Sequence, residues 1–143
     1  MKNKSKFIQI SCDGGAATGK STGGKVISRK YRLKFLSSGL LYRYASFLLL
    51  RYKPKNKLKF LKIKFNNLNY KKLNKMNLHT QKISEHSAII ARVGGVRLIL
   101  KKFQKEFSRK NKNCCIEGRD ISTKILPHSD LKFFFKCSLN IAA

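Results

Sequence analysis

Apolar residues recur along the chain with two periods, one typical of strands and one typical of helices. Short apolar runs bounded by turn residues predict strands at 6–12, 33–36, 114–116 and 131–136. Spacings of three and four residues predict helices at 20–32, 39–52 and 84–107. Strands that alternate with helices favour an α/β fold with a parallel sheet. We expect the last strand, which contains three consecutive phenylalanines, to be buried on both faces.

The helix expected at 84–107 has a regular apolar face. Steps of three and four residues connect Ile89, Val93, Val96, Leu100, Phe103 and Phe107. Ser84 is a suitable N-cap for this helix. Gly94 followed by Gly95 indicates a kink or a restart in its middle. We interpret the apolar stripe as a surface that faces the core.

The segment 53–77 is biased in composition, with 9 Lys and 6 Asn among its residues. Within it, apolar residues between 58 and 65 alternate with lysine, which predicts one or two amphipathic strands on an exposed sheet. Such a basic ribbon could bind nucleic acid, or it could be a solvated edge of the sheet. We favour the solvated edge, because no arginine and few aromatic residues are expected to face the lysines.

The whole chain is strongly basic. Its 143 residues include 33 Lys and Arg against 6 Asp and Glu, which gives a formal net charge of +27. With 42% hydrophobic residues it is too apolar for a disordered basic tail, so we expect one folded domain. The charge indicates either a phosphate-rich partner or a biased use of lysine, which outnumbers arginine 25 to 8.

Neither membrane segments nor metal-binding cysteines are predicted. The longest uncharged apolar stretch covers only 44–50, and the N-terminal apolar run is too short for a secretory signal. The four cysteines show no zinc-ligand spacing; they are Cys12, Cys114, Cys115 and Cys137. Small buried thiols in a reducing compartment are the simpler interpretation. We therefore expect a cytoplasmic protein.

The acidic residues are informative because they are scarce, and none occurs between 14 and 84. The six are Asp13, Glu85, Glu106, Glu117, Asp120 and Asp130. Asp13 directly precedes a glycine-rich loop, and Glu117 and Asp120 share a four-residue motif. In a chain so poor in acids, these positions indicate that a carboxylate is needed there.

The glycine-rich loop satisfies the phosphate-binding pattern G-x-x-x-x-G-K-[ST] at every defined position. It comprises Gly14, Gly15, Ala16, Ala17, Thr18, Gly19, Lys20 and Ser21, and Thr22 follows it. A strand is expected before it and a helix after it, so backbone N–H groups would surround a phosphate at the positive end of the helix. Lys20 would reach the β- and γ-phosphates, and the Ser21 hydroxyl would coordinate Mg²⁺. The loop predicts binding of a nucleoside triphosphate, with a P-loop protein that binds nucleic acid as the alternative.

Further segments resemble, in order, motifs of the bacterial cytidylate (CMP/dCMP) kinase family. Residues 12–22 resemble its D-G-P-A-A-S-G-K-S-T start, and residues 36–43 resemble L-D-T-G-A-M-Y-R. Residues 78–84 and 91–97 are similar to its I-R-T-x-x-V-S and V-A-A-I-P-x-V-R stretches. Residues 117–127 resemble E-G-R-D-I-G-T-x-V-F-P, and residues 131–135 resemble L-K-I-F-L.

This resemblance implies a single P-loop kinase core over 1–143, with 53–82 as a lysine- and asparagine-rich part of an inserted monophosphate-binding region. The implied reaction transfers the γ-phosphoryl group of ATP to CMP or dCMP, with Mg²⁺ as cofactor. A monomer is expected, with nucleic acid as a partner that is not favoured.

The resemblance also implies a role for each matching residue. Lys20 and Arg119 match catalytic positions, and Arg43 and Arg119 match arginines that clamp the acceptor phosphate. Arg97 and Asp120 match positions that recognise the cytosine edge. Two further residues that would line the acceptor pocket are Ser38 and Tyr42. Taken alone, Arg43 could be a solvent-facing helix residue, and Arg119 and Asp120 could form a local ion pair.

The sequence departs from the family pattern in several places. Ser37 stands where the family has Asp, Ala88 where it has a cytosine-contacting Ser, and His79 where it has Arg. Gly94 replaces a proline, and Ser122 replaces a glycine. The chain also stops where the family continues into an arginine-bearing lid, a last strand and a last helix. We expect a kinase core without these parts and with impaired activity, or an inactive remnant of one.

Overall fold

The structure is a computed structural model that describes residues 7–137. These residues divide into two compact units. The sheet unit comprises residues up to Ser37 together with those from Gln104 onward, and the helical unit comprises Ser38–Phe103. No helix within the described part of the chain combines the length and the apolarity needed to cross a membrane.

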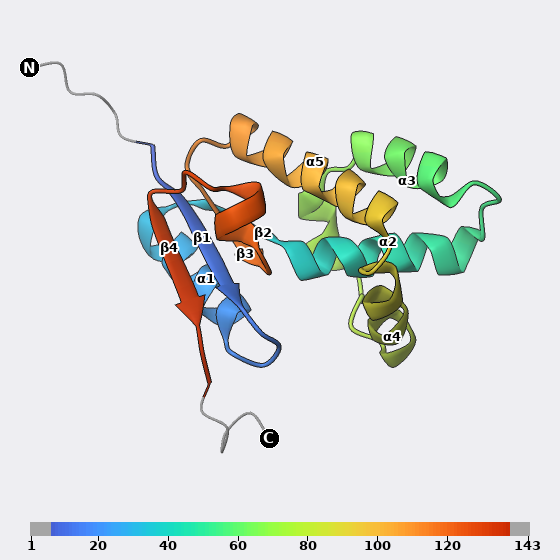
Figure 1. Cartoon of the computed structure of the whole chain (residues 1–143), viewed down its shortest axis with the longest axis horizontal. Coiled ribbons are helices and arrows are strands. Elements are labelled where there is room, and N and C mark those ends of the chain that lie inside the picture. The colour runs from blue at the N-terminus through green and yellow to red at the C-terminus, as the bar shows by residue number, and fades with distance from the viewer. Residues whose placement is uncertain (1–6, 138–143) are drawn as a thin grey trace, which may run out of the picture. The chain divides into compact units, whose positions relative to one another are not determined.

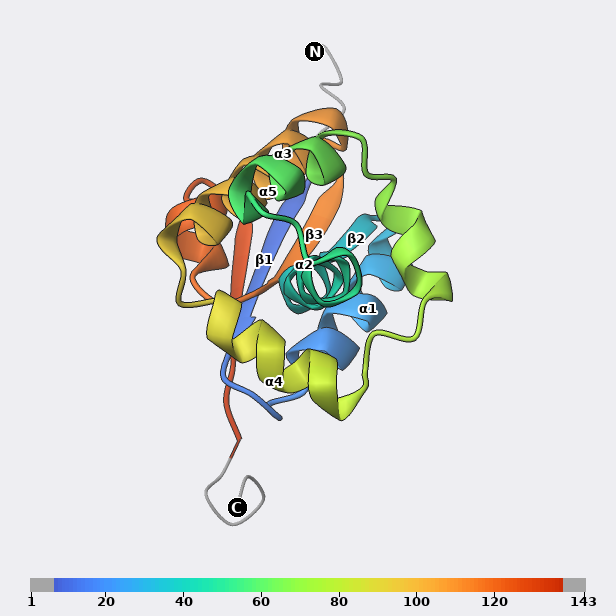
Figure 2. The same cartoon turned by 90° about the vertical axis from the view of Figure 1, so that its right-hand side faces the viewer.

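A parallel four-stranded sheet in the order β2-β3-β1-β4 is the basis of the sheet unit. The strands are β1 (Gln9–Gly14), β2 (Lys34–Ser37), β3 (Cys114–Gly118) and β4 (Leu131–Phe135). Figure 1 shows β4 beside β1, and Figure 2 shows β1, β3 and β2 in succession. Helix α1 (Lys20–Tyr31) packs against β1, β2 and β3. The predicted α/β class with a parallel sheet is confirmed.

The core of the sheet unit lies where β1 and β3 meet α1. Ile10, Cys12 and Cys115 form its buried cluster, and Ile27 and Phe35 pack against them. The predicted burial of the thiols is confirmed for Cys12, Cys114 and Cys115, which are buried and free, but not for Cys137, which is only partly buried. Burial raises the pKa of the Cys114 thiol to about 12, so this group stays protonated at neutral pH.

The last strand is exposed, and the prediction that it is buried on both faces was wrong. Among the described residues β4 pairs only with β1. Leu131, Phe133 and Phe134 are 49%, 40% and 66% exposed, respectively. An apolar run shows that a strand is suited to burial, but it does not say whether neighbours cover it.

The helical unit is built from α2 and the segments that surround it. Its elements are α2 (Ser38–Tyr52), α3 (Lys57–Asn66), the 3₁₀ helix η1 (Tyr70–Lys75), α4 (Gln81–Ile90) and the first part of α5 (Gly94–Lys110). Helix α2 contacts both α3 and α4, as Figure 2 shows where it is seen end-on. The rings of Tyr44, Phe65 and Phe103 pack edge to face in its core, with centroids 5.8 Å apart in each pair.

Residues 58–65, predicted as strands, form helix α3 instead. Leu61 and Phe65, four residues apart, are buried on one helical face, whereas Leu58 and Ile63 are exposed. Asn56 caps the helix by accepting a hydrogen bond from the backbone N–H of Lys59. The prediction was wrong because lysines between apolar residues fit the two-residue period of a strand as well as the 3.6-residue period of a helix. Burial of Leu61 and Phe65, at positions i and i+4, favours the helix.

Two helices, α4 and α5, occupy the segment predicted as one. Thr80 rather than Ser84 caps α4, because Thr80 Oγ1 accepts a hydrogen bond of 3.3 Å from the N–H of Ile83. The restart indicated by the glycine pair is confirmed, since α5 begins at Gly94. The assignment of Ser84 as N-cap was wrong, because its side chain has other partners, described below.

The break between the two helices also divides the apolar stripe. Along α5 the stripe is buried at Val96, Leu100 and Phe107. Ile89 and Val93 lie at the break and are exposed. The prediction of a core-facing stripe is therefore confirmed only for α5.

Gly14, the last residue of β1, pairs in register with Phe135 of β4. A Cβ atom at this position would lie 2.7 Å from the Phe135 carbonyl oxygen and 2.8 Å from Thr18 Oγ1. Since a carbonyl in a paired strand moves aside only at a cost, we expect Gly14→Ala to lower the free energy of unfolding by about 1–3 kcal/mol. Urea denaturation measures this change. Gly94→Ala is the control, because its Cβ meets nothing within 4 Å. Equal stability of the two variants would contradict the packing explanation.

Candidate functional site

The loop between β1 and α1 has the backbone geometry of a phosphate cradle. Ala17 and Gly19 adopt left-handed conformations, with φ of 57° and 83°. Left-handed residues within such a loop turn successive N–H groups to one side, where they can surround an anion. Gly19 precedes α1 and offers no side-chain cap, so the first N–H groups of the helix have no competing acceptor there. This geometry fits the phosphate-binding loop expected from the sequence.

Two side chains of the loop fold back on its own backbone. Lys20 Nζ donates a hydrogen bond of 3.0 Å to the carbonyl oxygen of Gly15, and Thr18 Oγ1 donates one of 2.8 Å to the same oxygen. The ammonium group is therefore held against the loop.

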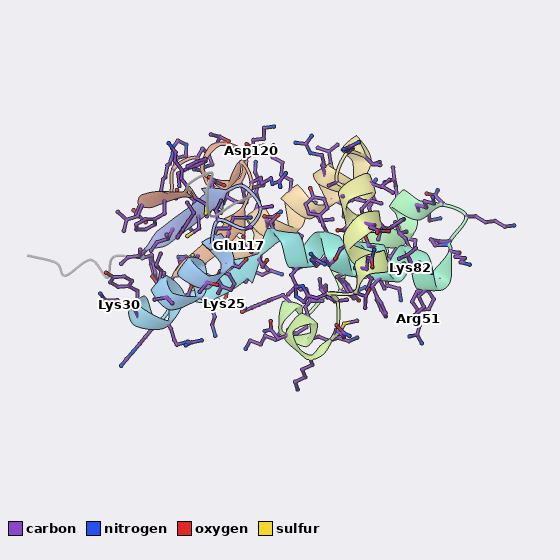
Figure 3. The ribbon with its side chains drawn as sticks, turned by 90° about the horizontal axis from the view of Figure 1, so that it is seen from below. Lys25, Lys30, Arg51, Lys82, Glu117 and Asp120 are labelled. Atoms are coloured by element: carbon purple, nitrogen blue, oxygen red, sulfur yellow. The ribbon has the colours of Figure 1, made fainter. Side chains whose placement is uncertain are left out.

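Glu117, at the end of β3, is buried beside the start of α1. Its side chain is 2% exposed, and its Oε1 accepts hydrogen bonds from Ser21 Oγ at 2.8 Å and from Ser37 Oγ. Figure 3 shows Glu117 among the ribbons of the sheet unit. Two hydroxyl donors to Oε1 offset part of the cost of burying this carboxylate.

The contacts of Glu117 add a residue to the candidate site. The sequence analysis singled out Glu117 as a rare acid but gave it no role. The sequence feature that indicates a role for Glu117 is a carboxylate at the end of an apolar strand in a chain with few acids. Ser37, which stands where the related family has Asp, donates to this carboxylate, whereas an aspartate would repel it.

Asp13 links the end of β1 to the turn that follows β3. Its carboxylate is 5% exposed and accepts hydrogen bonds from the backbone N–H groups of Ile121 at 2.7 Å and Ser122 at 2.9 Å. These residues open the short π-helical turn η2 (Ile121–Ile125). Asp13 thus fixes the segment that directly follows Arg119 and Asp120.

Arg119 and Asp120 themselves are exposed, and Asp120 adopts a left-handed conformation with φ of 57°. Figure 3 shows Asp120 at the periphery of the sheet unit. The Asp120 carboxylate lies 3.8 Å from Lys124 Nζ, in a surface contact of little energetic weight. The ion pair of Asp120 thus involves Lys124, and Arg119 remains a candidate for an anionic ligand.

In the helical unit, Arg43 is anchored by neutral partners. Its Nη1 donates hydrogen bonds to Ser84 Oγ at 2.6 Å and to the Leu78 carbonyl oxygen at 3.3 Å. Arg43 is half-buried, so it is not a solvent-facing helix residue. Ser84 therefore positions an arginine rather than capping a helix.

A second pair joins Tyr42 of α2 to Arg97 of α5. Burial raises the pKa of the Tyr42 hydroxyl, and its hydrogen bond and charge interaction with Arg97 partly offset that rise. Arg97 is otherwise exposed. Ser38, the first residue of α2, is buried. The helical unit thus brings Tyr42 and Arg97 together.

The two-donor contact of Asp13 allows a direct test of its structural role. In Asp13→Asn one carboxylate oxygen becomes an NH₂ group, which faces a backbone N–H instead of accepting from it. We expect the free energy of unfolding to fall by about 1–3 kcal/mol in urea denaturation.

Asp130→Asn is the matched control for this test. Asp130 is exposed, and among residues 7–137 its carboxylate accepts one backbone hydrogen bond, from Gln9 N–H at 2.8 Å, which an amide oxygen can still accept. A loss of stability as large for Asp130→Asn as for Asp13→Asn would contradict the proposed importance of the two-donor contact.

Comparisons with known proteins agree with the geometry of the sheet unit. The cytidylate kinase family model matches residues 10–143. The chain is 32% identical over 127 residues to a cytidylate kinase of Bradyrhizobium diazoefficiens, covering 87% of this chain and 59% of the relative. It is 32% identical over 143 residues to that of Bartonella quintana, covering 96% and 65%, respectively. A bifunctional pantoate ligase/cytidylate kinase of Prochlorococcus marinus is 33% identical over 147 residues, covering 92% of this chain and 29% of that protein.

The chain thus spans between 59% and 65% of the length of the first two relatives. The match nevertheless extends over nearly the whole of the present sequence and includes the loop, the Glu117 region and the helices α2 and α5, which carry Arg43 and Arg97. The chain belongs to the cytidylate kinase family.

Proposed function

We propose that this chain carries out the phosphoryl transfer of a nucleoside monophosphate kinase, from ATP to CMP or dCMP. The observation that carries this proposal is the geometry of the phosphate loop. Lys20 Nζ is hydrogen-bonded to the loop backbone, and Ser21 Oγ donates a hydrogen bond to Glu117. Membership of the cytidylate kinase family supports the choice of acceptor. The alternative of a P-loop protein devoted to nucleic acid is not favoured by relatives that are cytidylate kinases.

In the sheet unit, we assign the donor phosphates to the loop 14–22. Its backbone N–H groups would bind phosphate oxygens, and Lys20 would neutralise charge at the transferred group. The Ser21 hydroxyl and the Glu117 carboxylate, 2.8 Å apart, are oxygen ligands of the kind Mg²⁺ prefers, so the residues present fit this ion. When bound, Mg²⁺ would offset the negative charge of the phosphates.

We assign the acceptor to the arginines and to Asp120. Arg43 and Arg119 would bind the acceptor phosphate, because a guanidinium fork matches two oxygens at once. Asp120 would accept a hydrogen bond from the exocyclic amine of cytosine, which uracil lacks, and Arg97 would bind the same base edge. Tyr42 would hold Arg97 in place.

The remaining helical unit fits the same proposal. Ser38, buried at the start of α2, would line the acceptor pocket, and 53–82 would form part of the monophosphate-binding region. In this unit, Arg43 is fixed by neutral partners and keeps its full charge for a phosphate.

The chemistry needs positioning more than proton transfer. The bond between the γ-phosphorus of ATP and its bridging oxygen breaks, and a bond to an acceptor phosphate oxygen forms. The charge on the transferred group would be stabilised by Lys20 and Arg119. We also infer a cytoplasmic monomer, because cysteines without zinc-ligand spacing are typical of small thiols in a reducing compartment.

A coupled assay of ADP formation tests the proposal with CMP, dCMP, UMP and AMP as acceptors. We expect turnover with CMP and dCMP above that with UMP and AMP, and a loss of about 100-fold or more in Lys20→Ala. Absence of both CMP-dependent ADP formation and CMP binding would refute the proposed activity.

The role of Glu117 can be tested separately through the Mg²⁺ dependence of turnover. Glu117→Gln keeps the shape of the side chain and removes its charge. We expect it to raise the Mg²⁺ concentration at half-maximal rate by about 10–100-fold. Glu106→Gln is the control, because Glu106 lies on α5, away from the phosphate loop in the sequence, and forms an ion pair of 3.7 Å with Arg109. The same Mg²⁺ dependence in both variants would rule out a metal-related role for Glu117.

A further inference from the structure

Alternating rings and cations gather where α2 ends and α3 begins. This ring–cation ladder comprises Phe47, Arg51, Tyr52, Phe60 and Lys64. Arg51 Cζ lies 5.9 Å from the ring centroid of Phe47 and 5.7 Å from that of Tyr52. Lys64 Nζ lies 5.5 Å from the centroids of both Tyr52 and Phe60. The Tyr52 and Phe60 rings are themselves 5.7 Å apart and tilted by 49°.

The cations of the ladder are held by rings and not by carboxylates. Residues 38–103 contain 16 Lys and Arg against one acid, Glu85. Glu85 accepts a hydrogen bond from Gln81. Within the described part of the chain, both ion pairs lie in the sheet unit, at Arg109–Glu106 and Lys124–Asp120. Ring faces orient Arg51 and Lys64 without neutralising them, so their N–H groups can bind an anion.

Both charges of the ladder lie next to one ring, Tyr52, and that ring is exposed. Arg51 and Lys64 both lie within 5.7 Å of the Tyr52 centroid. Tyr52 is 53% exposed, and Figure 3 shows Arg51 at the surface of the helical unit. Fixed neighbouring cations suit successive phosphates of one strand, and an exposed ring suits a base.

This arrangement changes the interpretation of 53–77. The solvated alternative rested on lysines without arginine or aromatic neighbours, yet the fold places the rings of Tyr52 and Phe60 beside Lys64, and Arg51 beside the same Tyr52 ring. Lys53 and Lys55 lie in the turn between α2 and α3 and extend the basic surface. The bias in composition therefore includes an organised cluster.

We propose that the ladder, together with Lys53 and Lys55, binds single-stranded nucleic acid. The Arg51 fork and the Lys64 ammonium bind neighbouring phosphates, and Tyr52 contacts a base. The interaction is independent of the phosphate loop and of the proposed kinase activity.

An anionic membrane is a less suitable partner for this surface. Membrane-bound helices present a continuous apolar face to the lipid. In α3 the buried pair Leu61 and Phe65 already uses that face inside the protein. The exposed apolar residues, Leu58 and Ile63, are five positions apart and therefore point in different directions around the helix.

Fluorescence anisotropy with a labelled oligouridine tests the proposal on the full chain at two salt concentrations. We expect Arg51→Gln/Lys64→Gln to bind about 10-fold more weakly or worse, and its salt slope to fall by about 1.4 because two phosphate contacts are lost. Tyr52→Leu, which keeps an apolar side chain, should bind about fivefold more weakly or worse because stacking is lost. Arg51→Lys, which keeps the charge but not the fork, should lie in between.

The matched control is Lys30→Gln/Lys112→Gln. Each of these lysines lies over a single ring in the sheet unit, Tyr31 at 5.6 Å and Phe7 at 4.9 Å. The control removes the same charge, so weakening by about threefold or less is expected from the long-range field alone. Equal weakening of the two double variants would overturn the proposal.

A parallel arm measures binding to vesicles that contain anionic lipid. Binding of the wild-type chain to vesicles but not to oligouridine would overturn the proposal in favour of a membrane surface. Circular dichroism and urea midpoints equal to those of the wild type are expected for all variants, because the substituted side chains are exposed. If the double variant alone were destabilised, Arg51→Lys would decide, and undiminished binding by it and by Tyr52→Leu would overturn the proposal.

Discussion

The sheet unit depends on the rule that a buried carboxylate must find donors for its oxygens. Asp13 and Glu117 obey it at the same end of neighbouring strands, since Asp13 pairs in register with Gly118. Asp13 uses backbone N–H groups of the turn η2, and Glu117 uses the hydroxyls of Ser21 and Ser37. Two of the chain's six acids thus tie the phosphate loop, β2, β3 and η2 into one structure.

The sequence was most informative where chemistry acts through the local backbone. The strand, the loop and the helix start at Lys20 follow from small residues in fixed order, and the structure agrees. It was least informative at 58–65, where exposed lysines fit either period and only the burial of Leu61 and Phe65 selects a helix. Nor could spacing reveal that Ser84 serves Arg43, because that contact joins residues 41 positions apart.

Charge is arranged differently in the two units. In the sheet unit the two buried carboxylates, Asp13 and Glu117, accept hydrogen bonds from backbone amides and from hydroxyls, respectively. In the helical unit, arginines instead find neutral partners: a hydroxyl and a carbonyl for Arg43, a phenol for Arg97 and ring faces for Arg51. Neutral partners fix the direction of a cation without cancelling it. A unit poor in acids can therefore be ordered and still carry a field that attracts anions.

The net charge of the chain also affects whether its edge strand, β4, pairs with another copy. An apolar strand whose outer edge has no partner among the described residues is a template for pairing with another copy. At +27, two copies repel each other over roughly a Debye length, about 30 Å at 0.01 M salt but only about 8 Å at 0.15 M. Self-association through β4 is thus opposed by long-range repulsion that ions weaken. Added salt should therefore lower the colloidal stability of this chain, because it weakens the repulsion that opposes pairing at β4.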